Sequence, residues 1–341
     1  MSLKLSVVDQ SPIHDGAPPS KGPKDTLALA KACDDWGYYR YWLAEHHNTP
    51  GYASPCPEIM AAEVANQTQR IRVGSGGVLL PHYSPFKVAE TFRMLETLHP
   101  GRIDLGLGRA PGADERGTLA LAAPRKPIDP RLYPQQVADL MGFLHDNLPQ
   151  DHPFATVKAM PSDGGVPEVW LLGSSGGSAE LAGMVGASYA LALFIGVHER
   201  SPHIIKAYQN AFRPSPSLSS PRALIAVSAI CADSDEEAQY LSSTRSMWLF
   251  QALSLGRIIP LPTPEEAAML YHHLSPGQKS AYERILANNI AGTPEKCRDA
   301  IEKMALDYAV DEVMIVTVTH SFAARMQSYE KLAQIFELKQ S

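Results

Sequence analysis

A glutamate and two histidines, Glu45, His46 and His47, follow one another directly after an apolar segment. An imidazole that titrates near neutral pH can carry a proton or hydrogen-bond a reactive group. Neighbouring residues of an extended chain point to opposite sides, so we expect one histidine to face a binding site and the other to pack away from it. Two purely structural histidines are one alternative. A metal site is another, with His82 as the third ligand.

A second group of residues is suited to hold an anion. Arg109 follows a glycine at the end of an apolar segment, where an arginine can offer a bidentate fork to a phosphate or a carboxylate. An ion pair of Arg109 with Asp114 or Glu115 is the alternative. A serine-glycine turn opens a later helical pattern and would expose free N–H groups at a helix start. This serine-glycine turn consists of Ser174, Ser175, Gly176, Gly177 and Ser178.

Two further segment ends carry residues that would face a ligand. Gly76 and Gly77 end an apolar segment, and glycines there let a flat molecule approach the backbone, although a bulge or turn would give the same pattern. Asp9 and Gln10 follow the first apolar segment and would point polar groups into the same site. A simple polar loop start is the alternative for them. Asp9, Glu45 and His82 are therefore candidates for a substrate pocket.

Short apolar segments that recur every 32 to 36 residues must position these groups. Residues with helical spacing fill the intervals; in the first interval Gly37 is expected to stop the helix. Alternating strands and helices predict a parallel sheet, and eight such units favour a closed (β/α)₈ TIM barrel over an open doubly wound sheet. The predicted strands are 3–8, 39–43, 71–76, 103–107, 169–172, 189–194, 223–228 and 312–317. In such barrels the active site lies at the carboxyl ends of the strands.

The chain is longer than the roughly 250 residues of a simple barrel. We therefore expect a single domain over residues 1–341 with insertions at about 108–131, 148–166 and 231–291. The largest insertion follows strand seven and shows helical patterns without a clear strand. Trp248, Phe250 and Tyr271 lie in it and would either line a substrate pocket or pack together, and packing is favoured.

Charge and composition exclude several classes of partner. Thirty Lys and Arg against 36 Asp and Glu leave a net charge of −6 without a basic stripe, which argues against nucleic acid and anionic membranes. The longest apolar runs are about half of the roughly 20 residues that span a bilayer. The four cysteines lie far apart and the start of the chain lacks an export signal, so we expect a cytoplasmic protein that acts on a small molecule.

Taken together, the motifs resemble those of the bacterial luciferase-like flavin-dependent oxidoreductases, the luciferase-like monooxygenases. The resemblance spans nearly the whole chain. The segments that carry it are VDQSPI at 8–13, WLAEHH at 42–47, VGSGGVLLP at 73–81, DLGLGRAPG at 104–112, SSGGS at 174–178 and HSFAAR at 320–325.

The resemblance implies a site and a reaction. It implies a cis peptide bond at Gly76–Gly77 behind a flavin, His46 as the catalytic residue near the reactive edge of that flavin, and phosphate binding by Arg109 and the serine-glycine turn. Luciferase alpha chains have two alanines in place of the glycine pair, so we expect a wider flavin slot here. The implied reaction is oxidation of a small organic substrate by reduced FMN and O₂.

The resemblance also implies partners and leaves alternatives. No nicotinamide fingerprint is present, so we expect a separate flavin reductase to supply the reduced FMN. We further expect a homodimer through helices near 57–67 and 85–99. An F420-dependent dehydrogenase on the same barrel, a flavin-binding protein without turnover, and a metal-dependent hydrolase using His46, His47 and His82 are the alternatives.

Overall fold

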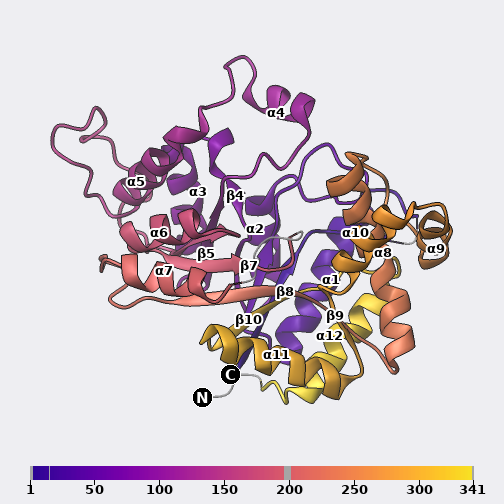
Figure 1. Ribbon diagram of the computed structural model, residues 1–341. Coiled ribbons are helices and arrows are strands. Elements are labelled where there is room, and N and C mark those ends of the chain that lie inside the picture. Colours follow the sequence, from indigo (N-terminus) through magenta and orange to yellow (C-terminus); the bar gives the residue numbers. More distant parts are fainter. Residues whose placement is uncertain (1–2, 15, 196–200, 340–341) are drawn as a thin grey trace.

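Eight parallel strands close into a barrel with helices around it (Figure 1). The computed structural model describes residues 3–14, 16–195 and 201–339. The strands follow the order β10-β1-β2-β3-β5-β6-β7-β8, and β10 pairs β8 to close the circle. The barrel strands are β1 (Lys4–Asp9), β2 (Arg40–Leu43), β3 (Arg72–Ser75), β5 (Ile103–Gly108), β6 (Glu168–Gly173), β7 (Ser188–Ala192), β8 (Ala223–Cys231) and β10 (Glu312–Val316). The TIM barrel predicted from the sequence is confirmed.

The structure contains two short strands that the sequence did not predict. The glycine pair interrupts the third strand, and the chain resumes as β4 (Val78–Leu79), which pairs with β5. β9 (Ile290–Gly292) pairs with the end of β8, so the expectation that the largest insertion has no strand is wrong. Runs of two and three residues are too short to show an alternating pattern, which is why the sequence does not reveal them.

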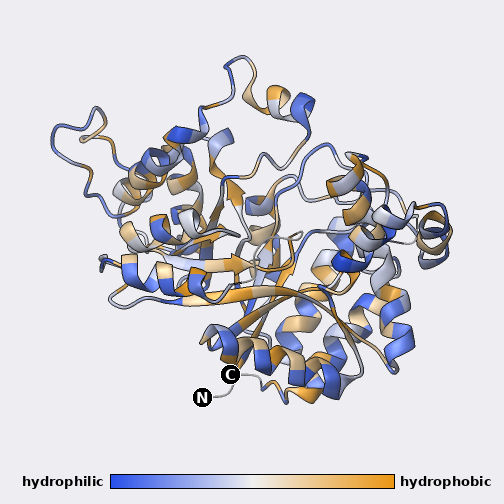
Figure 2. Ribbon diagram, in the orientation of Figure 1, coloured by the Kyte–Doolittle hydropathy of each residue, from blue (hydrophilic) through white to orange (hydrophobic). Residues whose placement is uncertain are grey.

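Helices cover the outside of the barrel, and Figure 2 shows that they are striped while the strands are largely apolar. Helix α1 ends where the sequence predicted, at Gly37, which has a positive φ of 89°. The helices are α1 (Lys21–Trp36), α2 (Pro57–Gln67), α3 (Pro85–Leu98), α4 (Glu115–Ala122), α5 (Tyr133–Leu144), α6 (Gly176–Met184), α7 (His203–Ala211), α8 (Asp235–Leu255), α9 (Pro264–His272), α10 (Pro276–Leu286), α11 (Pro294–Tyr308) and α12 (Phe322–Ile335), with 3₁₀ turns η1 (Leu80–His82) and η2 (Pro130–Leu132).

Side chains alternate along each strand between the barrel interior and the helix layer. On β1, Val8 joins an inner cluster with Trp42. Its neighbour Val7 joins the outer cluster, in which the strands pack against the helices, together with Tyr41. The same alternation predicts, for the residues just beyond each strand end, which side chains point to the barrel interior and which point to the helices.

An arginine closes the amino-terminal end of the barrel. The Arg40 side chain is 1 % exposed, and its guanidinium pairs with Asp104, Glu168 and Glu312 at 2.8, 3.0 and 2.9 Å. Burial alone would raise the pKa of Glu168, but the charges of Arg40 and two further arginines lower it to about 2. Because Arg40 and its three carboxylate partners fill this end of the barrel, a ligand has to enter from the carboxyl ends of the strands.

The longest excursion from the barrel lies between β8 and β9. Its helices α8, α9 and α10 pack on one another around buried Met247, Phe250 and Tyr282 and stand beside the barrel in Figure 1. The 108–131 segment contains α4 and η2, whereas residues 148–166 contain no helix or strand. In the described ranges, no helix combines the length and apolar character needed to cross a membrane.

Candidate active site at the carboxyl end of the barrel

His46 lies two residues beyond inward-facing Ala44 and continues that side of the strand. Its backbone N–H donates to the Ser54 carbonyl at 3.0 Å, and its Nδ1 lies 3.2 Å from Ser54 Oγ. The Tyr52 ring packs on the imidazole with centroids 5.1 Å apart. Burial lowers the pKa of His46 to about 4, against the opposing charge of Glu45, so the ring is neutral at pH 7. A neutral imidazole offers one N–H and one lone pair.

Glu45 turns to the other side of the strand, where its carboxylate contacts Leu79, Tyr83 and His47. Its buried carboxylate accepts from the Leu79 N–H at 2.9 Å and the Tyr83 hydroxyl at 2.8 Å. His47 Nε2 lies 2.8 Å from Glu45 Oε1. The expectation that the two histidines serve opposite sides therefore holds. The placement of Glu45 in a substrate pocket is wrong, because these partners already occupy its oxygens.

His82 lies on η1 and ties that turn to the loop after β5. Its Nε2 is 2.9 Å from the Pro111 carbonyl oxygen. Among residues 3–14, 16–195 and 201–339, no three His, Cys, Asp or Glu side chains come together as a metal site. His46, His47 and His82 are thus not the ligand set that the hydrolase alternative requires.

Asp9 points away from the barrel mouth, which corrects its prediction as a pocket residue. It follows inward-facing Val8, so alternation directs it toward the helices, where its side chain is fully buried. Its carboxylate pairs with Arg325 of α12 at 2.8 Å and accepts from the Tyr41 hydroxyl. Burial alone would raise the pKa of Asp9, but Arg325 and the hydrogen bonds hold it below its ordinary value.

The glycine pair lies in the barrel wall, and its Gly76–Gly77 peptide bond is cis, as the resemblance implied. A Cβ at Gly76 would lie 2.9 Å from Trp42 Cβ, and one at Gly77 would lie 2.7 Å from the Gly106 carbonyl oxygen. The space that two alanine methyls would need is therefore filled by protein atoms. The expected widening of the slot is wrong: the glycines allow the backbone to pack closely.

Arg109 and the serine-glycine turn stand at neighbouring strand ends. Leu107 of β5 pairs with Leu171 of β6, and two residues further on the register reaches Arg109 on one strand and Gly173 on the other. Adjacent strands run about 4.8 Å apart, so the arginine and the turn leave the barrel side by side. Asp114 accepts from the Gly117 N–H as the N-cap of α4. Arg109 is exposed.

The serine-glycine turn begins α6 and leaves its first N–H groups open. Ser178 Oγ donates to the Ser175 carbonyl at 2.7 Å and lies 3.0 Å from the Tyr189 hydroxyl, which fixes the turn. In the part of the chain that the structure describes, the N–H groups of Gly176 and Gly177 have no acceptor. A Cβ at either glycine would meet nothing within 4 Å. Free N–H groups at a helix start, over open space, attract an anion.

Comparison with known proteins assigns the family. Residues 3–308 match the family model described as luciferase-like monooxygenase. The chain belongs to the luciferase-like monooxygenase family. This confirms the resemblance seen in the motifs and makes the chain an oxidoreductase of the monooxygenase type.

Relatives of this family member cover nearly its full length. It is 42 % identical over 335 residues to the uncharacterized protein YceB of Bacillus subtilis (98 % of this chain, 99 % of the relative). It is 33 % identical over 336 residues to the N-acetyl-S-alkylcysteine monooxygenase of the same organism, covering 97 % of each. The crystal structure of apo-MsnO8 matches with a TM-score of 0.86 and 36 % identity over 99 % of this chain and 98 % of that one.

Two more distant structures share the fold and contain different cofactors. The oxygenating constituent of 3,6-diketocamphane monooxygenase from Pseudomonas putida, in complex with FMN, has a TM-score of 0.70 at 18 % identity, covering 98 % and 97 % of the two chains. An F420-dependent secondary alcohol dehydrogenase with an F420-acetone adduct has a TM-score of 0.71 at 14 % identity, covering 98 % and 99 %.

The large excursion reaches the His46 side of the barrel through Trp248. The Trp248 ring packs on Tyr52 with centroids 4.8 Å apart, and its Nε1 donates to the Ile259 carbonyl at 2.8 Å. Phe250 is fully buried, so the packing predicted for it is confirmed. The sequence analysis missed Tyr52 and Ser54, since nothing in the loop pattern shows that this segment folds back over His46.

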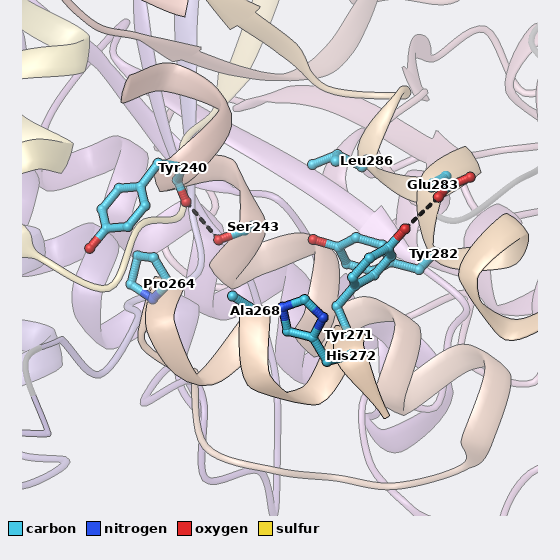
Figure 3. Close-up of a pocket in the computed structure, with 9 residues that line it drawn as sticks. All are labelled: Tyr240, Ser243, Pro264, Ala268, Tyr271, His272, Tyr282, Glu283 and Leu286. Carbon is cyan, nitrogen blue, oxygen red and sulfur yellow. Dashed lines mark hydrogen bonds between the residues drawn. The ribbon is translucent and has the colours of Figure 1, made fainter. Parts of the chain in front are cut away.

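Tyr271 instead lines a separate cavity of about 430 Å³ between α8, α9 and α10 (Figure 3). Its hydroxyl donates to Glu283 at 2.6 Å. Tyr240, Tyr282 and His272 also line this cavity, and none of the residues predicted for the flavin site does.

Proposed function

We propose that this chain is a flavin-dependent monooxygenase that uses reduced FMN and O₂ to oxidise a small organic molecule. The observation that supports the proposal is the register of β5 and β6, which makes neighbours of the strand end before exposed Arg109 and the strand end before the serine-glycine turn with its open N–H groups. A dianionic phosphate matches a guanidinium fork together with a helix start. The family and the FMN-bound fold relative agree with this assignment.

The residues around the site fit a flavin mononucleotide. Arg109 and the serine-glycine turn would bind its phosphate, and the cis Gly76–Gly77 segment would form the wall behind its ring. When bound, the flavin supplies the activation of O₂. His46 would present its neutral imidazole at the site, where Ser54 and Tyr52 fix the orientation of the ring. Trp248 would border the substrate side through Tyr52.

The proposal includes the partners expected from the sequence. The diketocamphane relative is described as an oxygenating constituent, which supports delivery of reduced FMN by a separate flavin reductase. A homodimer through α2 and α3 is supported by exposed Ile59, Met94 and Leu98 on these helices. We retain the single domain and the cytoplasmic location as part of this proposal.

Titration of the purified protein with oxidised FMN, with reduced FMN under anaerobic conditions, and with F420 tests the assignment. We expect one of the two FMN forms to bind with a Kd below about 100 μM, which corresponds to a standard free energy of about −5.5 kcal/mol. Binding of F420 with no binding of either FMN form would instead support the dehydrogenase. Failure of all three ligands to bind would contradict both functions.

A further inference from the structure

Gln10 is a buried glutamine at the carboxyl end of β1, beside His46. Asp9 pairs with Leu43, and Leu43 with Ser75, so the next residues in line are Gln10, Ala44 and Gly76. Gln10 follows outward-facing Asp9 and therefore points to the same side of the barrel wall as Val8. It thus shares one level of the barrel with the first residue of the cis glycine pair.

One end of the Gln10 side chain has no partner. Its Nε2 lies 3.5 Å from His46 Nε2, whereas its Oε1 is buried without a hydrogen-bond partner among the described residues. The residue as a whole is 8 % exposed. A buried carbonyl oxygen without a donor is costly, and native proteins seldom retain one unless a ligand or water completes it.

The contacts of His46 set the direction of these hydrogen bonds. The amide Nε2 of Gln10 can only donate, so the facing His46 Nε2 accepts. The single proton of the neutral imidazole then lies on Nδ1 and points to Ser54 Oγ at 3.2 Å. Gln10 Oε1 is left as an acceptor, and its missing partner is a hydrogen-bond donor.

We propose that Gln10 is a cofactor-binding residue whose Oε1 accepts a hydrogen bond from a ring N–H of the flavin. The inference rests on the proposed function and extends it from the phosphate end of the cofactor to its ring. A flavin ring that lies against Gly76 reaches the level of Gln10, and it carries N–H donors that an apolar substrate lacks. Gln10 would then contact the flavin ring through Oε1 and His46 through Nε2.

Binding of reduced FMN to Gln10→Leu and Gln10→Glu tests the contact. Loss of the acceptor in Gln10→Leu should raise the Kd about tenfold. Gln10→Glu keeps an acceptor oxygen for the ring N–H, although its second oxygen cannot donate to His46 Nε2, so its Kd should rise clearly less than that of Gln10→Leu. Without ligand, the melting temperature of Gln10→Leu should stay within a few degrees of the wild type, because Oε1 has no protein partner to lose and Nε2 loses only its long 3.5 Å contact with His46.

Gln136→Leu is the matched control, because Gln136 is another buried glutamine whose Oε1 has no partner and it lies on α5. We expect it to bind reduced FMN like the wild type. If Gln10→Leu binds reduced FMN as tightly as the wild type, the Gln10 contact is refuted but the proposed function is not. The same holds if Gln136→Leu loses as much affinity as Gln10→Leu. A wild-type protein that binds neither FMN form would overturn the proposed function and the contact with it.

Discussion

The adjacent residues His46 and His47 have different roles because neighbouring side chains of an extended chain point to opposite sides. His46 continues the inward side and is held neutral by burial, next to Ser54 and Gln10. His47 continues the opposite side and supports the buried carboxylate of Glu45. A reactive role and a structural role thus fall on neighbouring residues, and substitutions can separate them.

Replacement of each histidine by alanine should have opposite consequences. His46→Ala should bind FMN like the wild type but slow O₂ consumption with reduced FMN by about 100-fold, the lower range for a lost acid–base group. His47→Ala should retain the oxygen reaction and lower the free energy of unfolding by about 1–3 kcal/mol, because the buried carboxylate of Glu45 loses a partner. Oxygen uptake and urea unfolding measure the two effects. Exchanged phenotypes would show that the roles are assigned to the wrong residues.

At the scale of elements, a buried ion pair joins the first strand to the last helix. Asp9 ends β1, and Arg325 reaches it from the first turns of α12 at 2.8 Å. Arg325 also donates to the Thr317 carbonyl just after β10. The pair therefore fixes the seam between β1 and β10, on which closure of the barrel depends, and it leaves the neighbouring Gln10 free to face the interior.

Arg325→Met should destabilise the protein by about 3–5 kcal/mol, because it leaves the buried charge of Asp9 without its cation. Lys303→Met breaks an exposed ion pair with Asp307 and serves as the control. It should change the free energy of unfolding by no more than about 1 kcal/mol. Similar losses for the two variants in urea unfolding would contradict the structural role of the buried pair.

At the scale of the whole molecule, two histidines with a lowered pKa make stability depend on pH. Burial lowers the pKa of both His14 and His46 to about 4. Between their ordinary pKa near 6.5 and this value, the unfolded chain binds protons that the folded chain does not. The contribution of these histidines to the free energy of unfolding is therefore fully present above pH 6.5 and is lost as the pH drops toward 4. Below 4.5 the lowered pKa of Glu168 adds a further loss.

Thermal unfolding at a series of pH values measures this effect. We expect the melting temperature to fall steadily from pH 6.5 to pH 4.5. His46→Asn should show a shallower decline, because it removes one of the histidines whose pKa burial lowers to about 4. A melting temperature that stays level or rises over this interval would contradict the neutral state of these histidines in the folded chain.

The sequence predicts the repeating part of the fold well and the long-range contacts poorly. Strand–helix units of 32 to 36 residues suffice to predict the barrel, because each unit shows its own apolar pattern. The sequence does not reveal that Asp9 meets Arg325, since 316 positions separate them. It also does not reveal that the glycine pair faces packed backbone, because the filling atoms belong to Trp42 and Gly106 on other strands.

The central claim is that Arg109 and the start of α6 together bind the phosphate of FMN. Isothermal titration of wild type and Arg109→Ala with oxidised FMN and with riboflavin, which lacks the phosphate, tests it most directly. Arg109→Ala should lose about 1.5–3 kcal/mol of FMN affinity, the worth of a charge-assisted hydrogen bond, with riboflavin affinity unchanged. An equal loss for both ligands, or no loss for FMN, would contradict the account.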